Sequence, residues 1–229
     1  MISIIIPTYN EAEIIKKTIE RLQQYDKDGL VKQIIIVDGG SIDDTIIIAK
    51  TIGIEAVVSP QKGRAAQMNH GAALATENIL YFLHADTNPP ENFIKDISSA
   101  LMQGYGSGCY QLSFDYSHWF LNVNCWFTRF NVNAVRFGDQ SLFVQKGMFE
   151  KAGGFREDLL LMEDQEIIHR LKNQGKFIVL NGQVITSARK YLDNGIYKIQ
   201  FIFYTIWLLY YLGFSQQYLL RVYRRLIRK

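Results

Sequence analysis

Four short apolar runs, each followed by a stretch with helical spacing, constrain the fold of this chain more than any other feature of its sequence. The runs lie at residues 4–6, 33–37, 56–58 and 79–83, and polar or turn residues bound each of them. Short runs of this kind are typical of strands that are covered on both faces. Strand and helix alternate, which predicts an α/β fold with an open, mostly parallel sheet flanked by helices and joined by right-handed crossovers.

The loops that follow these runs form the predicted ligand site. In an open α/β sheet, ligands bind beyond the carboxyl ends of the strands. Three of the four loops hold a carboxylate, at Glu11, Asp38 and Asp86, and the other holds a cation at Arg64. A single carboxylate at a strand end is commonly a helix cap. Three of them favour a polar ligand at this edge of the sheet.

Each loop residue has a specific predicted role beside a plainer one. Asp38 precedes two glycines, where a planar ligand can approach the backbone. Arg64 opens a helix whose positive end favours a diphosphate; the plainer interpretation is a solvated arginine. Asp86 follows a strand and suits Mn²⁺ or Mg²⁺, which take oxygen ligands from one or two carboxylates and from phosphates. His84 is either a further metal contact or a polar strand end.

The second half of the chain is predicted to extend the same sheet. Strand-like runs at residues 109–114 and 141–144 precede an acidic segment at 162–166, which leads into the apolar helical positions Ile167 and Leu171. Acids in the first turn of a helix match its dipole, which is one interpretation of this segment. The other is a general base, since transfer to a hydroxyl needs a carboxylate within hydrogen-bond reach of the acceptor proton.

Charge and cysteine content exclude several classes of protein. Five of the 25 basic residues lie at positions 221–229, and removing them leaves 20 against 22 acidic residues, so the body is not predicted to bind nucleic acid. Two cysteines, outside any CxxC motif, suit a reducing cytosolic setting, and the first residues lack the basic region and cleavage site of a signal peptide. The first strand is not followed by a GxGxxG fingerprint, which argues against a dinucleotide-dependent oxidoreductase.

Several motifs together resemble the family 2 glycosyltransferases of the GT-A fold, in the same order and at suitable separations. The resemblance covers roughly residues 1 to 190 and depends on four segments: Pro7-Thr-Tyr-Asn-Glu11, Val37-Asp-Gly-Gly-Ser-Ile-Asp-Asp-Thr45, His84-Ala-Asp86 and Glu163-Asp164. It implies a nucleotide diphosphate sugar donor, a divalent cation and transfer with inversion at the anomeric carbon. The Gln-x-x-Arg-Trp motif of processive members is missing, which indicates addition of a single sugar.

The resemblance also implies roles for individual residues. Asp38 contacts the nucleobase, Glu11 the nucleoside region, Asp86 the metal, and Asp164 is the catalytic base; Pro7 and Thr8 of the first motif join the donor site. Family members usually have aspartate where this chain has His84. Further segments are similar to a bacterial subgroup of small uncharacterised members, which implies that three more residues line the site: Arg64, Gln140 and Arg189. The alternative is a catalytically silent, membrane-associated protein that binds nucleotide sugars.

Residues 196–229 are predicted to form a helical tail beyond a glycosyltransferase domain at residues 1–195. The apolar run at 201–212 is shorter than the roughly 20 residues that span a bilayer. Beyond it, aliphatic residues and arginines separate onto two faces of a helix. The aliphatic face is Leu219, Val222 and Leu226, and the basic face is Arg221, Arg224, Arg225 and Arg228.

Basic amphipathic helices of this type lie in the headgroup region of anionic membranes. The alternative is a helix packed on its own core, or on a second subunit in a homodimer, with its arginines in water. Membrane contact suits a lipid or lipid-linked acceptor. The aromatic segment at 119–137 either forms a groove for this acceptor or belongs to the core. We expect a cytoplasmic protein attached peripherally to the inner face of the membrane.

Overall fold

A computed structural model of the chain describes residues 1–136 and 138–227. Arg228 of the predicted basic face and Phe137 at the end of the aromatic segment lie outside the described residues. The helices are α1 (Ile15–Tyr25), α2 (Thr45–Thr51), α3 (Arg64–Leu74), α4 (Phe93–Met102), α5 (Trp119–Phe127), α6 (Lys146–Lys151), α7 (Glu163–Gln174), α8 (Arg189–Asn194), α9 (Ile196–Tyr211) and α10 (Gln216–Leu226), with 3₁₀ turns at Asn133–Val135 and Gly138–Gln140.

The strands of the described residues form one sheet of eight, in the order β3-β2-β1-β4-β7-β6-β8-β5. They are β1 (Ile2–Thr8), β2 (Val31–Asp38), β3 (Glu55–Val58), β4 (Ile79–Phe82), β5 (Thr87–Asn88), β6 (Ser107–Phe114), β7 (Leu142–Gln145) and β8 (Phe177–Thr186). The pairings among β1, β2, β3 and β4 are parallel, and β6 pairs with β8 in parallel. Strand β7 runs antiparallel to β4 and β6, and β5 runs antiparallel to β8. The predicted α/β sheet is confirmed, and the second half of the chain extends it.

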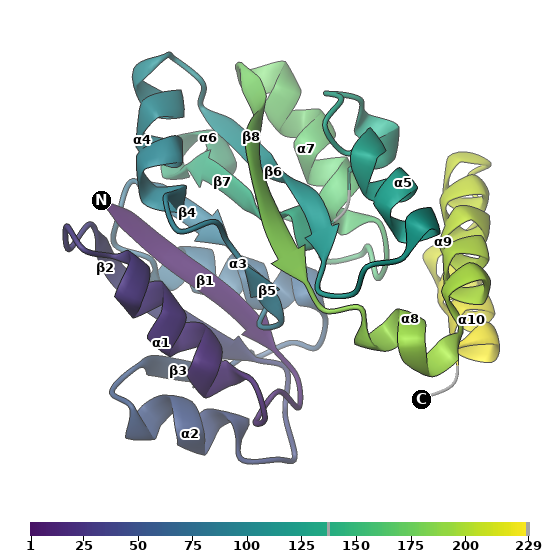
Figure 1. The fold of residues 1–229 in the computed structure, drawn as a ribbon, viewed down its shortest axis with the longest axis horizontal. Coiled ribbons are helices and arrows are strands. Elements are labelled where there is room, and N and C mark those ends of the chain that lie inside the picture. Colours follow the sequence, from purple (N-terminus) through teal and green to yellow (C-terminus); the bar gives the residue numbers. More distant parts are fainter. Residues whose placement is uncertain (137, 228–229) are drawn as a thin grey trace.

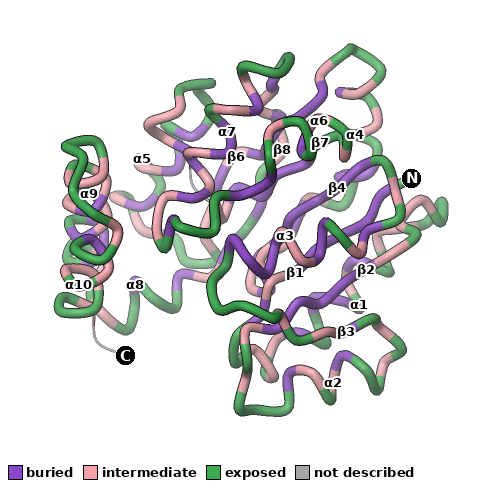
Figure 2. The backbone as a smooth tube through the Cα atoms, turned by 180° about the vertical axis from the view of Figure 1, so that it is seen from behind, coloured by how far each residue is buried: buried purple, intermediate pink, exposed green. Residues whose placement is uncertain are grey.

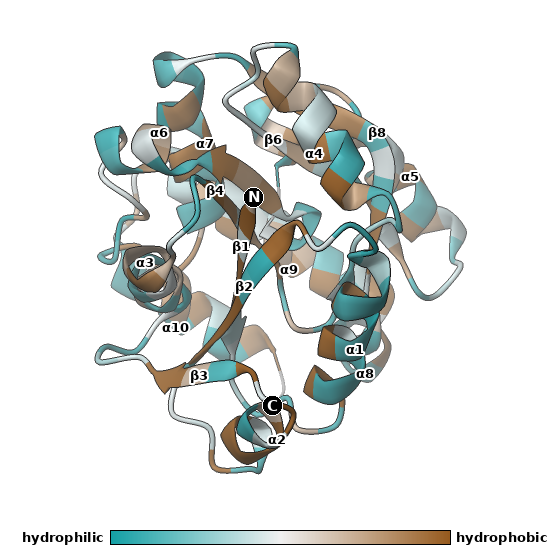
Figure 3. Cartoon of the chain, turned by 90° about the vertical axis from the view of Figure 1, so that its left-hand side faces the viewer, coloured by the Kyte–Doolittle hydropathy of each residue, from teal (hydrophilic) through white to brown (hydrophobic). Residues whose placement is uncertain are grey.

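Helices cover both faces of the sheet, which explains why its first strands are apolar throughout (Figure 1). In β1, Ile4 and Ile6 pack with α1, α2 and α4, while Ile5 packs on the other face with α3, α6 and α7. Hydrophobic residues concentrate on β1 and β2 (Figure 3). Helix α3 lies so close to the sheet that a Cβ atom at Gly71 would collide with Ile5. The rigid core therefore fixes the carboxyl ends of these strands.

A short antiparallel pairing joins the two halves of the chain beside the strand ends. Thr87 in β5 pairs with Thr186 at the end of β8, and their side-chain hydroxyls are 3.0 Å apart. Both residues are buried. The pairing places Asp86 next to the segment that leads from β8 into α8, about a hundred positions later in the sequence.

The tail helices α9 and α10 stand beside the sheet and pack on the body of the protein (Figures 1 and 2). Leu219 and Val222 of α10 belong to a cluster with Ile202 and Ile206 of α9, and this cluster includes Leu121 of α5. The arginines of α10 are exposed. Leu219 and Val222 thus lie against the protein, whereas Leu226 of the same aliphatic face is exposed. Among the described residues, no helix has the length and apolar character needed to cross a bilayer.

Polar contacts also tie the tail to the segment that begins α7. The side-chain oxygen of Gln216 accepts hydrogen bonds from the backbone N–H groups of Leu160 and Leu161, both at 3.1 Å. The hydroxyl of Tyr211 donates to the side-chain oxygen of Gln165 at 3.1 Å. Met162, between these contacts, has a left-handed backbone with φ of 72°, which is uncommon for a residue other than glycine. The start of α7 is therefore held in place by the tail.

Candidate active site

Two cavities meet beyond the carboxyl ends of the strands. The larger has a volume of about 500 Å³ and lies over the ends of β1 and β4 and the start of α8. The smaller has a volume of about 260 Å³ and lies between α5, α7, α9 and α10. Six residues line both cavities: Arg64, Phe114, Asp139, Lys190, Tyr191 and Phe203. A ligand in one cavity is therefore next to a ligand in the other.

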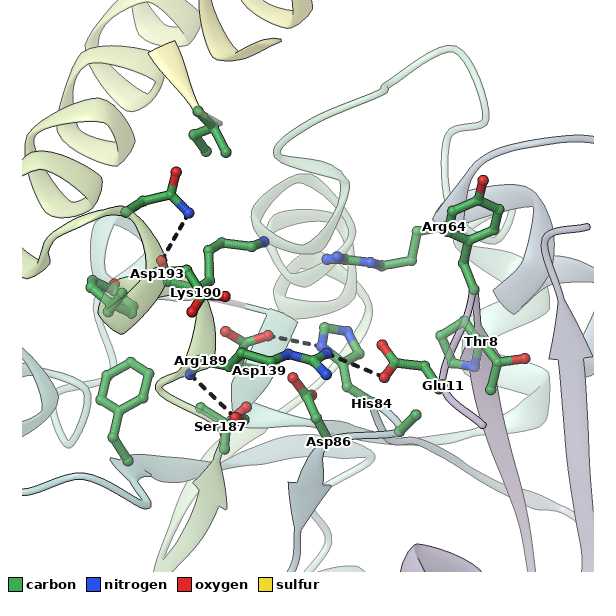
Figure 4. Close-up of a pocket in the computed structure, with 18 of the residues that line it drawn as sticks. Thr8, Glu11, Arg64, His84, Asp86, Asp139, Ser187, Arg189, Lys190 and Asp193 are labelled. Carbon is green, nitrogen blue, oxygen red and sulfur yellow. Dashed lines mark hydrogen bonds and ion pairs between the residues drawn. The ribbon is translucent and has the colours of Figure 1, made fainter. Parts of the chain in front are cut away.

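The larger cavity gathers predicted donor-site residues from distant parts of the sequence (Figure 4). Pro7 and Thr8 end β1, Glu11 follows in the loop, and Arg189 begins α8. The guanidinium of Arg189 lies 3.3 Å from a carboxylate oxygen of Glu11. Burial raises the pKa of Glu11, and the neighbouring Asp86 adds to the rise, while Arg189 lowers it. Acidic and basic side chains thus lie next to one another on the wall of this cavity.

His84 is paired with Asp139, a residue for which no role was predicted. The Nδ1 atom of His84 lies 2.8 Å from a carboxylate oxygen of Asp139 (Figure 4). Burial by itself would raise the pKa of Asp139, but the hydrogen bond and charge of His84, together with Arg64, lower it to about 2. Asp139 is therefore ionised at neutral pH. This ion pair occupies His84 at the position where family members usually have aspartate.

The surroundings of Asp86 fit a metal ion that arrives with a diphosphate. Its carboxylate lines the larger cavity, and the hydrogen bond that it accepts, from the hydroxyl of Thr87, is long at 3.4 Å. The described residues contain no group of three His, Cys, Asp or Glu side chains that could hold a metal by themselves. Mg²⁺ and Mn²⁺ commonly take one or two protein carboxylates and complete their shell with phosphates and water. Asp86 suffices for that arrangement.

Arg64 connects the two cavities to the acidic start of α7. Its guanidinium lies 3.6 Å from Glu163 and 3.9 Å from Asp164. As the sequence predicts, Arg64 is the first residue of a helix, α3. A Cβ atom at Gly138 would overlap the carboxylate of Asp164, so only glycine lets this segment approach so closely. Glu163 and Asp164 both line the smaller cavity.

The two carboxyl groups titrate as an interacting pair. Burial raises the pKa of Glu163 to about 7; the charge of Asp164 adds to this rise and Arg64 opposes it. Burial also raises the pKa of Asp164, while Arg64 and His84 lower it. Because the two groups interact, their protons are lost from the pair and not from each residue independently. The cation Arg64 lowers the pKa of both groups and so favours an ionised carboxyl in this pair.

Two predicted donor-site residues do not reach the cavities. Asp38 is fully buried, and its carboxylate accepts hydrogen bonds from the backbone of Gly40 and Ser41 and from the hydroxyls of Ser41 and Thr8. Gln140 is 1% exposed and donates to the backbone oxygen of Tyr110 at 2.7 Å. In this structure Asp38 shapes the loop after β2, and Gln140 holds β6. A position at a strand end does not by itself reveal which way the side chain turns, so donor contact by these two residues stays a prediction.

The structure adds residues to the site that the sequence analysis left without a role. Lys190 extends toward Arg64 from the opposite side of the larger cavity (Figure 4). Gln67 donates to the backbone oxygens of Thr8 and Val37, both at 2.8 Å, and so holds the ends of β1 and β2 together. Lys190 directly follows Arg189, which was predicted to line the site. Its position next to Arg189 was the one feature of the sequence that could have indicated a role for Lys190. Its side chain gives the cavity a third cation.

Solved structures of glycosyltransferases share this architecture. A mannosyltransferase from Pyrobaculum calidifontis, solved with GDP-Man and Mn²⁺, aligns over 98% of this chain and 69% of its own, with a TM-score of 0.72 and 16% identity. S. aureus TarS 1–349 in complex with UDP aligns over 81% of this chain and 60% of its own, with a TM-score of 0.68 and 15% identity. These likenesses establish the GT-A fold.

Sequence comparison identifies the family. The glucosyl-3-phosphoglycerate synthase of Mycobacterium tuberculosis is 32% identical over 116 residues, which are 46% of this chain. An uncharacterised glycosyltransferase of Rickettsia felis is 32% identical over 85 residues, or 37% of this chain. The matched segments span 35% and 28% of these relatives. Residues 3–156 match the model of glycosyl transferase family 2, and the chain belongs to that family.

Proposed function

We propose that the protein is an inverting, metal-dependent glycosyltransferase that moves a sugar from a nucleotide diphosphate sugar to a hydroxyl of a lipid or lipid-linked acceptor. The observation behind this proposal is the meeting of the two cavities at Arg64. One cavity has the charges that suit a diphosphate, and the other has a buried pair of carboxyl groups beside an apolar lining. A donor and an acceptor placed there would lie next to one another.

The larger cavity is the proposed donor site. Arg64, Arg189 and Lys190 provide three cations for the two phosphates. Arg64 also lies at the positive end of α3, which favours an anion at the same place. Glu11 positions Arg189 through their ion pair and is proposed to face the nucleoside. Pro7 and Thr8 form the wall on which the nucleotide rests.

Asp86 would hold the Mn²⁺ or Mg²⁺ ion. Such an ion neutralises charge on the departing diphosphate and orients it. With the three cations neutralised by the diphosphate, the carboxylate of Asp86 and the phosphate oxygens would together provide the oxygen ligands that this ion prefers. The neighbouring Glu11, whose pKa burial raises, is available to accept a hydrogen bond or a charge there.

Asp164 is the proposed base for the transfer. The acceptor hydroxyl attacks the anomeric carbon and gives its proton to Asp164, while the bond from that carbon to the diphosphate oxygen breaks and the diphosphate leaves with the electron pair. A single displacement with one base inverts the anomeric centre. The hydrogen-bonded pair of His84 and Asp139 lies beside this position, and Asp139 is ionised there at neutral pH, since its pKa is about 2.

The smaller cavity is the proposed acceptor site. Its lining includes Phe203, Ile206 and Trp207 from α9 and Cys125 from α5. The indole N–H of Trp207 is buried without a hydrogen-bond partner among the described residues, so it is a donor available to an acceptor oxygen. An apolar lining suits an acceptor with an apolar part. We propose peripheral attachment to the inner face of the membrane, in a reducing compartment that suits the two free cysteines.

A screen of nucleotide sugars tests the proposal. Thermal unfolding of the full chain is measured with UDP- and GDP-sugars, each with Mn²⁺, with Mg²⁺ and with a chelator, because a ligand that binds the native state raises its apparent stability. A metal-dependent rise with one nucleotide class, followed by slow release of free sugar or nucleotide diphosphate, is the expected outcome. Binding without any turnover would favour a catalytically silent nucleotide-sugar-binding protein. No stabilisation by any nucleotide sugar would contradict the proposed donor site.

A further inference from the structure

Helix α9 exposes a continuous stripe of large apolar side chains. Tyr197, Phe201, Tyr204, Leu208 and Tyr211 recur at helical spacing along one side, and each is exposed, Phe201 by 70%. The opposite side of the helix is buried at Ile199, Ile202 and Ile206. The apolar composition of α9 is thus divided between the protein core and the surface.

Helix α5 exposes a second stripe of the same kind. Trp119, which is 64% exposed, is followed at helical spacing by Val123, Trp126 and Phe127, and all of these are exposed. Leu121 and Cys125 on the other side are buried. The aromatic segment predicted from the sequence is therefore partly core and partly surface.

The two stripes belong to one surface. The ring of Tyr197 lies 5.0 Å from that of Phe120 and 6.4 Å from that of Trp119. Further along, the hydroxyl of Tyr204 is hydrogen-bonded to the side chain of Asn124. The helices are thus in contact at both points. We call this surface the aromatic face, and it comprises Trp119, Val123, Trp126, Phe127, Tyr197, Phe201, Tyr204 and Leu208.

The charges around the aromatic face are all positive among the described residues of α5, α9 and α10. These helices contain no aspartate or glutamate. Arg129 lies over the ring of Trp126, with its Cζ atom 4.8 Å from the ring centroid, and Lys198 lies on α9. The arginines of α10 project into solvent beside α9. An apolar surface with a cationic rim matches an anionic lipid headgroup layer.

These properties favour a bilayer over a second copy of the chain as the occupant. Soluble monomers rarely expose apolar patches of this extent, and tryptophan and tyrosine concentrate where hydrocarbon meets headgroups. In a symmetric dimer the same patch would meet itself. Its basic rim would then lie against another basic rim, with no acidic residue on these helices to compensate.

We propose that the aromatic face is the membrane-contacting surface, which inserts its rings into the interface of an anionic bilayer while the α10 arginines remain among the headgroups. This inference rests on the membrane attachment proposed above and specifies the residues that produce it. The inner sides of the same helices, at Cys125 and Phe203, line the proposed acceptor cavity. An acceptor embedded in the bilayer would therefore lie about one helix diameter, roughly 10 Å, from the cavity.

Tryptophan fluorescence with brominated lipids tests the position of the aromatic face directly. The chain has three tryptophans, so Trp207→Phe leaves Trp119 and Trp126, both on this face, as the reporters. With vesicles of phosphatidylglycerol and phosphatidylcholine, we expect a blue shift of the emission and quenching when the acyl chains are brominated. Because insertion is apolar, part of the binding should survive molar salt. Absence of quenching in the presence of bound vesicles would overturn the proposal.

Paired substitutions test whether the apolar side chains of the aromatic face drive partitioning. Phe201→Ser with Leu208→Ser should weaken partitioning onto these vesicles by at least about tenfold, whereas Phe201→Trp should preserve it. The control is Ile42→Ser with Met102→Ser, which removes even more exposed apolar side chains far from this face and should leave partitioning unchanged. Equal losses in both double variants would overturn the proposal.

Sedimentation of the same variants without lipid completes the test. The proposal would be overturned if the protein does not bind vesicles and instead forms a dimer that the Phe201→Ser, Leu208→Ser double variant dissociates. That outcome would assign the aromatic face to a second copy of the chain. Vesicle binding is measured without nucleotide, and donor binding is measured without vesicles. Failure of membrane contact and failure of the proposed transferase activity would thus appear in separate experiments.

Discussion

The guanidinium of Arg64 lies 3.6 Å from a carboxylate oxygen of Glu163, and Arg64 also lines the cavity proposed for the donor. One cation therefore serves two neighbours: the carboxyl pair at the start of α7 and the diphosphate that would enter from the other side. When a diphosphate attracts Arg64, the carboxyl groups lose part of the positive charge that lowers their pKa values. Donor binding and the basicity of Asp164 are coupled through this side chain.

Replacing Arg64 by glutamine should affect both cavities. Loss of a charged hydrogen-bond donor to the diphosphate is expected to weaken donor binding about tenfold or more. Without the guanidinium, the pKa values of Glu163 and Asp164 should rise, which moves the acidic limb of the kcat/KM profile to higher pH. The measurement is the pH–rate profile beside donor titration. Arg156→Gln, an exposed arginine outside both cavities, is the matched control.

Asp164→Asn should leave donor affinity nearly unchanged and lower kcat by about 10²-fold or more, because the asparagine amide cannot take up the proton of the acceptor hydroxyl. Asp158→Asn removes a nearby exposed carboxylate and should preserve turnover. Full activity of the Asp164 variant would shift the role of base to Glu163.

Glu163 should make the protein less stable as the pH rises. Its carboxyl has a pKa of about 7 in the folded chain, against 4.5 for an unperturbed group, so the folded state binds the proton more tightly than the unfolded state. The resulting stabilisation is complete below pH 4.5 and is lost as the pH rises through about 7. The measurement is the free energy of urea unfolding across this range. In Glu163→Gln the corresponding slope should be shallower; an identical slope would contradict the assignment.

Asp86→Ala should abolish the Mn²⁺-dependent part of donor binding and leave the fold intact, because the side chain faces a cavity and makes one long hydrogen bond. Isothermal titration of nucleotide diphosphate with and without Mn²⁺ measures this dependence. Glu13→Ala, which removes an exposed carboxylate close to Glu11 in the sequence, should retain the metal effect. Retention of the full effect in Asp86→Ala would place the metal on other residues.

The first half of the fold and the donor-side strand ends were predictable, since a strand buried on both faces must be apolar throughout, as β1 is. Strand β8 was not predicted. Its buried and exposed positions do not alternate regularly, and its register against β6 shifts between Tyr110 and Gln111. The pairing of His84 with Asp139 was also invisible, because the two residues are 55 positions apart and meet only once the sheet has formed.

The contact between Gln216 and the backbone of Leu160 and Leu161 limits how this chain can be recombined with its relatives. A chimera that exchanges the tail at residue 196 keeps every predicted catalytic side chain, yet it replaces the acceptor atom that orders the loop before Asp164. The interchangeable unit is therefore discontinuous: the tail and the loop at 159–165 have to come from the same parent. Libraries that aim to change acceptor preference should shuffle these two segments together.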